Sequence, residues 1–246
     1  MAVRLVGLEF EGGWRNRIFL DTAFRDDISV PCPESVDDKG VMLYMHKPGR
    51  QPWHFGEIVS PPLRPGEEVF TWADKHYPLD PSPVLNEGTG QERGSGIHVH
   101  LSFDTLEDYS RVASRRFYNI FLTTLADWGK RVELPPEHQF WRRLKGANRF
   151  AKRHFNPRRQ IGITTKNSLA NAPRRTALNY CFGLHGTVEV RIAPTFIPKA
   201  IGLDYIRVVV DCFEDFLSSP RGLEMSPFKR VFLVGDVGKV LAGGGA

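Results

Sequence analysis

Two glutamates, two histidines and a Glu-Arg pair occupy every second position in three short stretches of the sequence. Glu9 and Glu11 lie in GLEFEG, His98 and His100 in GSGIHVHLSF, and Glu189 and Arg191 in GTVEVRIAPTF. Carboxylate and imidazole groups are ligands for divalent metal ions, and a guanidinium beside them binds the oxygens of an anion such as phosphate. These residue types suggest a divalent-metal site with a cation next to it.

The residues between the polar ones are apolar, which predicts a strand for each stretch. Val188, Val190 and Ile192 alternate with Glu189 and Arg191, and successive side chains of a strand point to opposite faces. Side chains two apart lie roughly 6.5–7 Å from each other, so neighbouring members of a pair can meet different groups. One such strand alone would be interpreted as solvated on its polar face, whereas three with the same pattern favour a shared site.

A fourth stretch, GEIVSPPL at residues 56–63, adds a carboxylate at Glu57. We expect a strand over residues 53–59 that ends at Pro61-Pro62, because proline has no N–H for sheet pairing.

The four motifs, together with RRTALNYC at residues 174–181, resemble the amidoligase family in their types and order. These are small carboxylate–amine ligases related to glutamine synthetase and glutamate–cysteine ligase, and GSGIHVHLSF is close to the glutamine synthetase pattern. The resemblance covers about residues 4–217. It implies an α+β fold with a curved, mainly antiparallel sheet, whose concave face holds the metals and whose outer face carries the helices.

The resemblance also implies a role for each residue. Glu9, His98 and Glu189 would hold the metal nearest the nucleotide phosphates, Glu11 a second metal near the carboxylate substrate, and Glu57 would assist there. Arg191 would meet the transferring phosphoryl group, and Glu189 and Glu57 would share in catalysis. His100 would line the nucleotide phosphates or support the metal ligands. Arg174 or Arg175, together with Asn179, would position substrate or phosphate. Larger relatives carry more carboxylates for the second metal than this sequence does.

The implied activity is ATP-dependent formation of an amide bond through an acyl phosphate, with Mg²⁺ or Mn²⁺. Carboxylate is a poor electrophile, and phosphoryl transfer to it needs divalent ions and cationic groups more than covalent chemistry. The expected partners are ATP and small-molecule or peptide carboxylates and amines. Two alternatives stay open: a kinase of the same superfamily, and a non-catalytic protein of a virion or larger assembly that retains the ligase fold.

Composition and charge are those of an ordinary globular protein. The chain has 246 residues, 41% hydrophobic and 25% charged, with a net charge of +5 and three cysteines. No apolar run approaches the roughly 20 residues of a membrane span, and the N-terminal residues lack the features of a signal peptide. We therefore expect a cytoplasmic protein with reduced thiols and no membrane partner.

Basic residues cluster at residues 141–159 and again at Arg174-Arg175. A solvated basic helix explains the cluster, and so do nucleotide phosphates, an acidic substrate or a nucleic-acid backbone. The sequence does not separate these, although nucleic acid is not the partner we favour. Homo-oligomers and assembly partners are equally open.

Periodicity and turn residues outline the remaining elements. We expect strands at 17–20 and 41–45, a loop at 79–96, and helices at 67–75, 105–130, 137–153 and 199–217. Asp104 or Thr105 caps the second of these helices. Strands joined by hairpins and followed by helices indicate an α+β domain over residues 1–221, with a C-terminal tail at 222–246.

Overall fold

The computed structural model describes residues 2–14, 54–77, 85–86, 91–92, 96–147, 151–161, 176–196 and 198–219. Within these ranges, the side chains of residues 11–14, 54–58, 85–86, 91–92 and 184 lie outside the description. The strands expected at 17–20 and 41–45, the residues Arg174 and Arg175, and the tail at 222–246 also lie outside the described residues.

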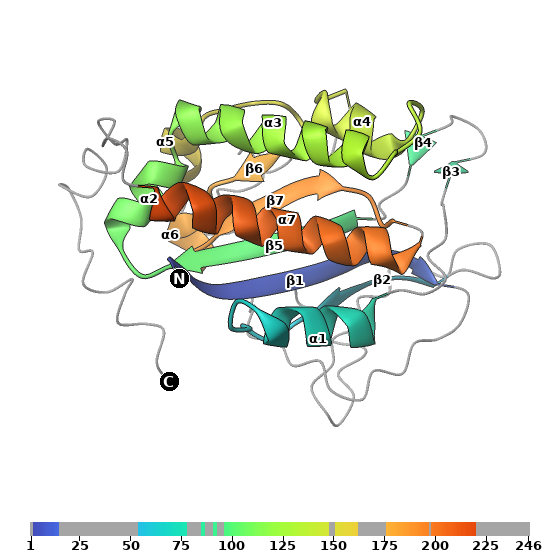
Figure 1. Cartoon of the computed structure of the whole chain (residues 1–246), viewed down its shortest axis with the longest axis horizontal. Coiled ribbons are helices and arrows are strands. Elements are labelled where there is room, and N and C mark those ends of the chain that lie inside the picture. Colours follow the sequence, from blue (N-terminus) through green and yellow to red (C-terminus); the bar gives the residue numbers. More distant parts are fainter. Residues whose placement is uncertain are drawn as a thin grey trace.

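An antiparallel sheet forms the centre of the molecule (Figure 1). Its strands run in the order β2-β1-β5-β7-β6, and every neighbouring pair is antiparallel. The strands are β1 (Val3–Trp14), β2 (His54–Val59), β5 (Gly96–Phe103), β6 (Leu178–Asn179) and β7 (Val188–Ala193). A separate two-stranded ladder pairs β3 (Leu85–Asn86) with β4 (Gln91–Glu92) inside the stretch expected to be loop.

Seven helices complete the described part of the chain. They are α1 (Glu67–His76), α2 (Leu106–Val112), α3 (Arg115–Arg131), α4 (Gln139–Leu144), α5 (Pro157–Ile161), α6 (Phe182–His185) and α7 (Lys199–Ser218). Helix α7 crosses in front of the sheet, with α3 on one side of it and α1 on the other (Figure 1). The expectation of an α+β domain with a mainly antiparallel sheet is confirmed. No helix in the described ranges is long and apolar enough to cross a membrane.

The apolar face of the sheet packs against these helices. The Phe103 ring of β5 stacks on Phe213 of α7 at 5.8 Å, and the Phe10 ring of β1 stacks on Trp72 of α1 at 5.7 Å. Both phenylalanines are fully or almost fully buried. Each such burial contributes about 1.5–3 kcal/mol, so the alternation in the strands directs the polar side chains to the other face.

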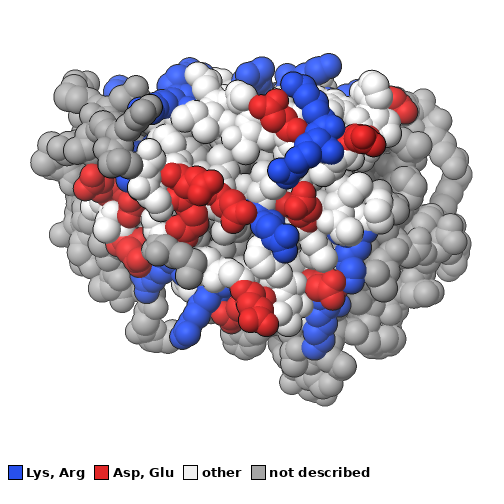
Figure 2. Space-filling model, viewed as in Figure 1, with Lys and Arg blue, Asp and Glu red and all other residues white. Residues whose placement is uncertain are grey.

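The outer surface of this helical layer carries charges of both signs, with Asp and Glu side chains over its middle (Figure 2). Several exposed cations there are paired with acids. Lys130 lies 3.2 Å from Asp127, and Arg131 lies 3.6 Å from Asp204. The helix-covered face therefore carries both signs, with some of its cations paired to acids.

The single helix expected at 105–130 is wrong, because the chain forms two helices that meet at Ala113-Ser114. Ser114 adopts an extended conformation, and its hydroxyl accepts a hydrogen bond from Phe117 N at 3.1 Å. A serine cap satisfies an N–H that a new helix would otherwise leave unpaired. Thr105 caps α2 in the same way through Asp108 N at 3.1 Å, as expected.

The helix expected at 137–153 is also wrong, since α4 ends at Leu144. Gly146 has φ +73°, and a Cβ at this position would meet Cβ of Arg153 at 2.5 Å. The left-handed conformation and the close return of the chain both require glycine here. The helices expected at 67–75 and 199–217 are confirmed, each extending one residue further.

Candidate metal centre

Strand pairing brings the three polar stretches side by side. Glu9 of β1 lies opposite His98 of β5, and His100 of β5 lies opposite Glu189 of β7. The residue opposite His100 in β1 is Gly7, where a Cβ would approach Cβ of His100 to 3.3 Å. Glycine at this position leaves His100 the room to lie over β1 toward Glu9.

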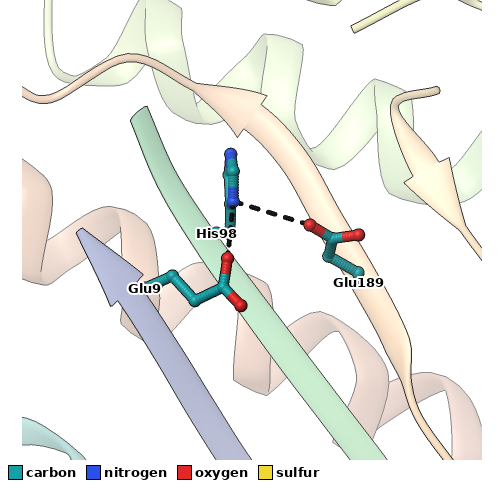
Figure 3. Close-up of side chains that lie close together, drawn as sticks. All are labelled: Glu9, His98 and Glu189. Atoms are coloured by element: carbon teal, nitrogen blue, oxygen red, sulfur yellow. Dashed lines mark hydrogen bonds and ion pairs between the residues drawn. The ribbon is translucent and has the colours of Figure 1, made fainter. Parts of the chain in front are cut away.

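Glu9, His98 and Glu189 converge on one point (Figure 3). Nδ1 of His98 lies 2.9 Å from Oε2 of Glu9 and 3.5 Å from Oε1 of Glu189. One potential ligand atom from each residue lies within 4.8 Å of the others. The side chains are nearly buried, with exposed fractions of 13% for Glu9, 5% for His98 and 6% for Glu189. Two buried carboxylates and an imidazole that face one another form a candidate metal centre.

His100 joins the same cluster from the next position on the face. Its Nε2 lies 3.1 Å from Oε1 of Glu9 and 3.8 Å from Oε1 of Glu189, in the geometry of an ion pair rather than an aligned hydrogen bond. Its Nδ1 is 3.2 Å from Oγ1 of Thr187. His100 therefore lies next to the candidate metal ligands, with Nδ1 near Thr187 and Nε2 near the two carboxylates.

Glu189 connects the cluster to two further side chains. Its Oε2 accepts a hydrogen bond from Nδ2 of Asn179 at 2.8 Å, and its Oε1 accepts one from Nη1 of Arg191. Asn179 is held opposite Glu189 by the β6–β7 pairing. The resemblance placed Asn179 on substrate or phosphate, whereas in this structure its side chain orients a metal-ligand candidate.

Electrostatics make the cluster strongly ionised despite its burial. Burial alone would raise the pKa of Glu9, but the charges of His100 and His98 hold it well below its ordinary value. Burial would also raise the pKa of Glu189, but the charge of Arg191, followed by those of the histidines, lowers this pKa to about 2. Burial would lower the pKa of His100, whereas Glu9, Cys181 and Glu189 hold it well above its ordinary value. The carboxylates are thus balanced by imidazolium and guanidinium groups.

The donor set fits a divalent first-row or alkaline-earth ion. Carboxylate oxygens suit Mg²⁺ and Mn²⁺, and imidazole extends the preference toward Mn²⁺. The same nitrogen of His98, Nδ1, faces both carboxylates, so one ligand atom of the ring is directed at the oxygens that would hold the ion.

For four residues expected at the site, the structure does not describe the side chain. The backbone of Glu11 lies opposite Glu57 in the β1–β2 pair, as a two-carboxylate second site would require, but their side chains lie outside the described residues. Arg174 and Arg175 lie outside them altogether. The second metal site and the arginine contacts stay predictions.

Sequence reasoning missed three residues around the cluster. Thr187 contacts His100, and the Cys181 thiol donates to the Thr187 carbonyl at 3.3 Å. Arg143 of α4 is 3% exposed and donates to the Ala193 carbonyl at 2.7 Å, where the β5–β7 register shifts. Thr187 could have been found from its place two residues before Glu189 on the polar face. Arg143 gave no such signal, because its approach depends on Gly96.

The absence of a side chain at Gly96 lets Arg143 of α4 approach the cluster. A Cβ at this position would lie 3.2 Å from Nη1 of Arg143 and 3.4 Å from Nε2 of His98. Both groups therefore approach the same glycine. A side chain at this position would press on the Arg143 guanidinium and would come into van der Waals contact with the His98 ring.

No family model and no curated protein matches the chain.

Proposed function

We propose that this protein is an ATP-dependent carboxylate–amine ligase that activates its acid as an acyl phosphate. The observation that supports the proposal is the convergence of Glu9, His98 and Glu189 from three strands on one buried point, with Arg191 bonded to Glu189. The order of the motifs along the chain supports the same activity through its resemblance to amidoligases.

The residues divide the work between holding an ion and meeting the substrate. Glu9, His98 and Glu189 would hold a divalent ion, Mn²⁺ or Mg²⁺. Such an ion, when bound, neutralises the charge on nucleotide phosphates. Asn179 and His100 orient Glu189 and Glu9 through the contacts described above, which is the role that supporting hydrogen bonds have around metal ligands.

Arg191 would supply the cation for the phosphoryl group. Its guanidinium is on the same face as Glu189 and already touches the cluster, so it is within reach of an anion bound beside the ion. The planar fork of arginine engages two phosphate oxygens at once. A fixed donor of this kind is most effective where negative charge develops during transfer.

The activity is tested with ATP, Mg²⁺ or Mn²⁺, a panel of amino acids and acidic peptides, and hydroxylamine. Hydroxylamine traps an acyl phosphate as a hydroxamate, which is measured as its coloured iron complex alongside ADP. We expect hydroxamate with at least one acid, and its loss in Glu9→Gln. Asp104→Asn, an exposed acid of similar chemistry at 61% exposure, is the matched control.

The outcomes separate the alternatives. ADP formation with a stable phosphorylated product and no dependence on an amine would identify a kinase. Absence of both ADP and metal-dependent ATP binding would identify a protein that retains the arrangement without catalysis.

A further inference from the structure

A long basic segment, residues 138–188, contains no acidic residue. It holds eleven Lys and Arg between Glu137 and Glu189. The rest of the chain has 22 of the 33 Lys and Arg and all 28 Asp and Glu, so its formal charge is −6 against +11 for the basic segment. The modest net charge of +5 conceals this separation. Where the charges of such a segment are exposed, they attract a partner of the opposite sign.

Four of the described cations of this segment are exposed and form no ion pair with the described residues. Arg142, Lys145, Lys152 and Arg158 are all exposed, and among the described residues none of them forms an ion pair. Four cations elsewhere have an acid beside them: Arg4 lies near Asp104, Lys130 near Asp127, Arg131 near Asp204 and Lys199 near Asp74. The described part of the chain therefore does not neutralise the charges of Arg142, Lys145, Lys152 and Arg158 by ion pairs.

The basic segment is attached to the edge of the sheet that carries the metal centre. Lys152 and Thr176 form an isolated parallel β-bridge, and the Lys152 carbonyl accepts a hydrogen bond from Ala177 N at 3.0 Å. The Ala177 carbonyl in turn accepts from Arg191 N at 3.1 Å. Two backbone hydrogen bonds thus link the backbone of Lys152 to that of Arg191, and a partner bound along this edge would lie near the strand that carries Glu189.

Helix α5 is fixed to the same edge by buried polar contacts. Nε2 of Gln160 donates to Oγ1 of Thr176 at 2.9 Å, and its Oε1 accepts from Tyr180 N at 3.3 Å. Arg158 therefore lies on a helix that is anchored in the core by Gln160, two residues further along. The Arg158 side chain is exposed, while the helix that carries it is bonded to residues at the edge of the sheet.

The described surface favours a polypeptide over a nucleic acid. Single-stranded nucleic acid stacks its bases on exposed aromatic rings, but Phe155 is covered by Arg115 at 4.3 Å and by Tyr118 at 5.2 Å, and Trp141 is partly buried against the core. In the described ranges Ile120 is the one exposed large hydrophobic residue. The helices α4 and α5 have six and five residues, whereas duplex readers insert a protruding helix or ribbon into the major groove.

We infer that the edge formed by α4 and residues 151–161 binds an acidic polypeptide, one rich in Asp and Glu, and guides it to the metal centre. The guiding role rests on the proposed ligase function and would make the acid substrate a peptide carboxylate. The binding itself does not require the ion. It can therefore be tested separately.

The test measures binding of fluorescein-labelled poly-L-glutamate by anisotropy, in EDTA and at several salt concentrations. Wild type is compared with a variant carrying Arg142→Gln, Lys145→Gln, Lys152→Gln and Arg158→Gln. The control carries Arg4→Gln, Arg64→Gln, Lys75→Gln and Lys199→Gln, which changes the net charge equally through two arginines and two lysines elsewhere. Circular dichroism and thermal melting verify that all three proteins are folded.

We expect the first variant to bind at least about tenfold more weakly, as the loss of four surface charge contacts predicts, and the control to lose less than about threefold. Equal weakening in both variants would overturn the inference, because it would reflect net charge alone. If a labelled DNA duplex bound more tightly than poly-L-glutamate, and the first variant lost this binding, the partner of the surface would be a nucleic acid and the inference would be wrong. If poly-L-glutamate bound in EDTA but no acid gave a hydroxamate, the inferred binding surface would stand and the proposed ligase activity would be wrong.

Discussion

Arg191 donates a hydrogen bond to Oε1 of Glu189, and this same oxygen lies 3.5 Å from Nδ1 of His98. One atom thus serves as partner of the guanidinium and as candidate ligand of the ion. An ion that took a share of the Oε1 charge would weaken the attraction of this oxygen for Arg191. The arginine would then be available to an anion bound beside the ion, and the two halves of the proposed site would be coupled.

The first prediction concerns this arginine. Arg191→Lys keeps the charge but loses the fork that engages two oxygens. We expect Mg·ATP binding within about twofold of wild type and hydroxamate formation at least about tenfold slower, since an interaction made mainly in the transition state affects turnover and not ground-state binding.

Arg131→Lys, on the surface of α3, is the matched control and should leave both values unchanged. Equal trapping rates in wild type and Arg191→Lys would remove Arg191 from the reaction and leave it as a structural partner of Glu189.

The second prediction concerns the ion. A ligand that binds only the folded state stabilises it by about 2.7 kcal/mol at one hundred times its dissociation constant. We expect Mn²⁺ to raise the melting temperature of wild type by several degrees, and EDTA to reverse the shift. In His98→Ala the shift should disappear, because one of three ligands is lost.

His154→Ala removes an exposed histidine and should retain the full Mn²⁺ shift. If His98→Ala responded to Mn²⁺ as wild type does, the ion would bind elsewhere, and the three residues would form only an ion-pair network.

The third prediction concerns pH in the absence of metal. The pKa values of Glu9 and Glu189 are lowered on folding, so their contribution to stability is present above about 4.5 and is lost as pH falls through the folded values. The pKa of His100 is raised, so its contribution is complete below about 6.5 and is lost as pH rises through the folded value. The cluster therefore stabilises the metal-free protein most between these limits.

Urea unfolding in EDTA from pH 4 to 9 measures this dependence. His100→Gln removes the titrating group and should flatten the fall in the unfolding free energy above pH 6.5. An unchanged alkaline slope in this variant would show that His100 does not carry the proton.

The fourth prediction concerns the break between α2 and α3. Ser114→Ala removes the hydroxyl that caps α3, which costs about 1 kcal/mol and lowers the melting temperature by about 2–4 °C. Ser114→Asp keeps an acceptor at the cap and should melt close to wild type. A continuous helix through this position would instead make alanine the more stabilising residue.

The site could be predicted from the sequence because it rests on strand alternation. The period-two patterns place Glu9, His98, His100 and Glu189 on polar faces whatever the details of the fold, and antiparallel pairing then aligns them. The same local signals gave the strand with Glu57 and the helix α7.

The remainder depends on contacts between distant residues, which local patterns do not contain. Strand β6 is two residues long and exists because Asn179 and Leu178 pair with β7. Helix α4 ends early because the chain at Arg153 returns against Gly146. The position of Arg143 depends on a glycine in another element. Ser114 did carry a local signal, but the apolar periodicity on both sides of it favoured one long helix.

The order of strands in the sheet also has a consequence for synthesis of the chain. Strand β1 lies between β2 and β5, and both of these precede β7 in the sequence. A growing chain can therefore pair Glu9 with His98 while residue 189 is still inside the ribosome. The third ligand candidate then joins by adding β7 to an existing edge. Ion binding by this cluster would report that β7 has docked, and a ribosome-stalled series of increasing length should acquire Mn²⁺ affinity only after β7 has emerged.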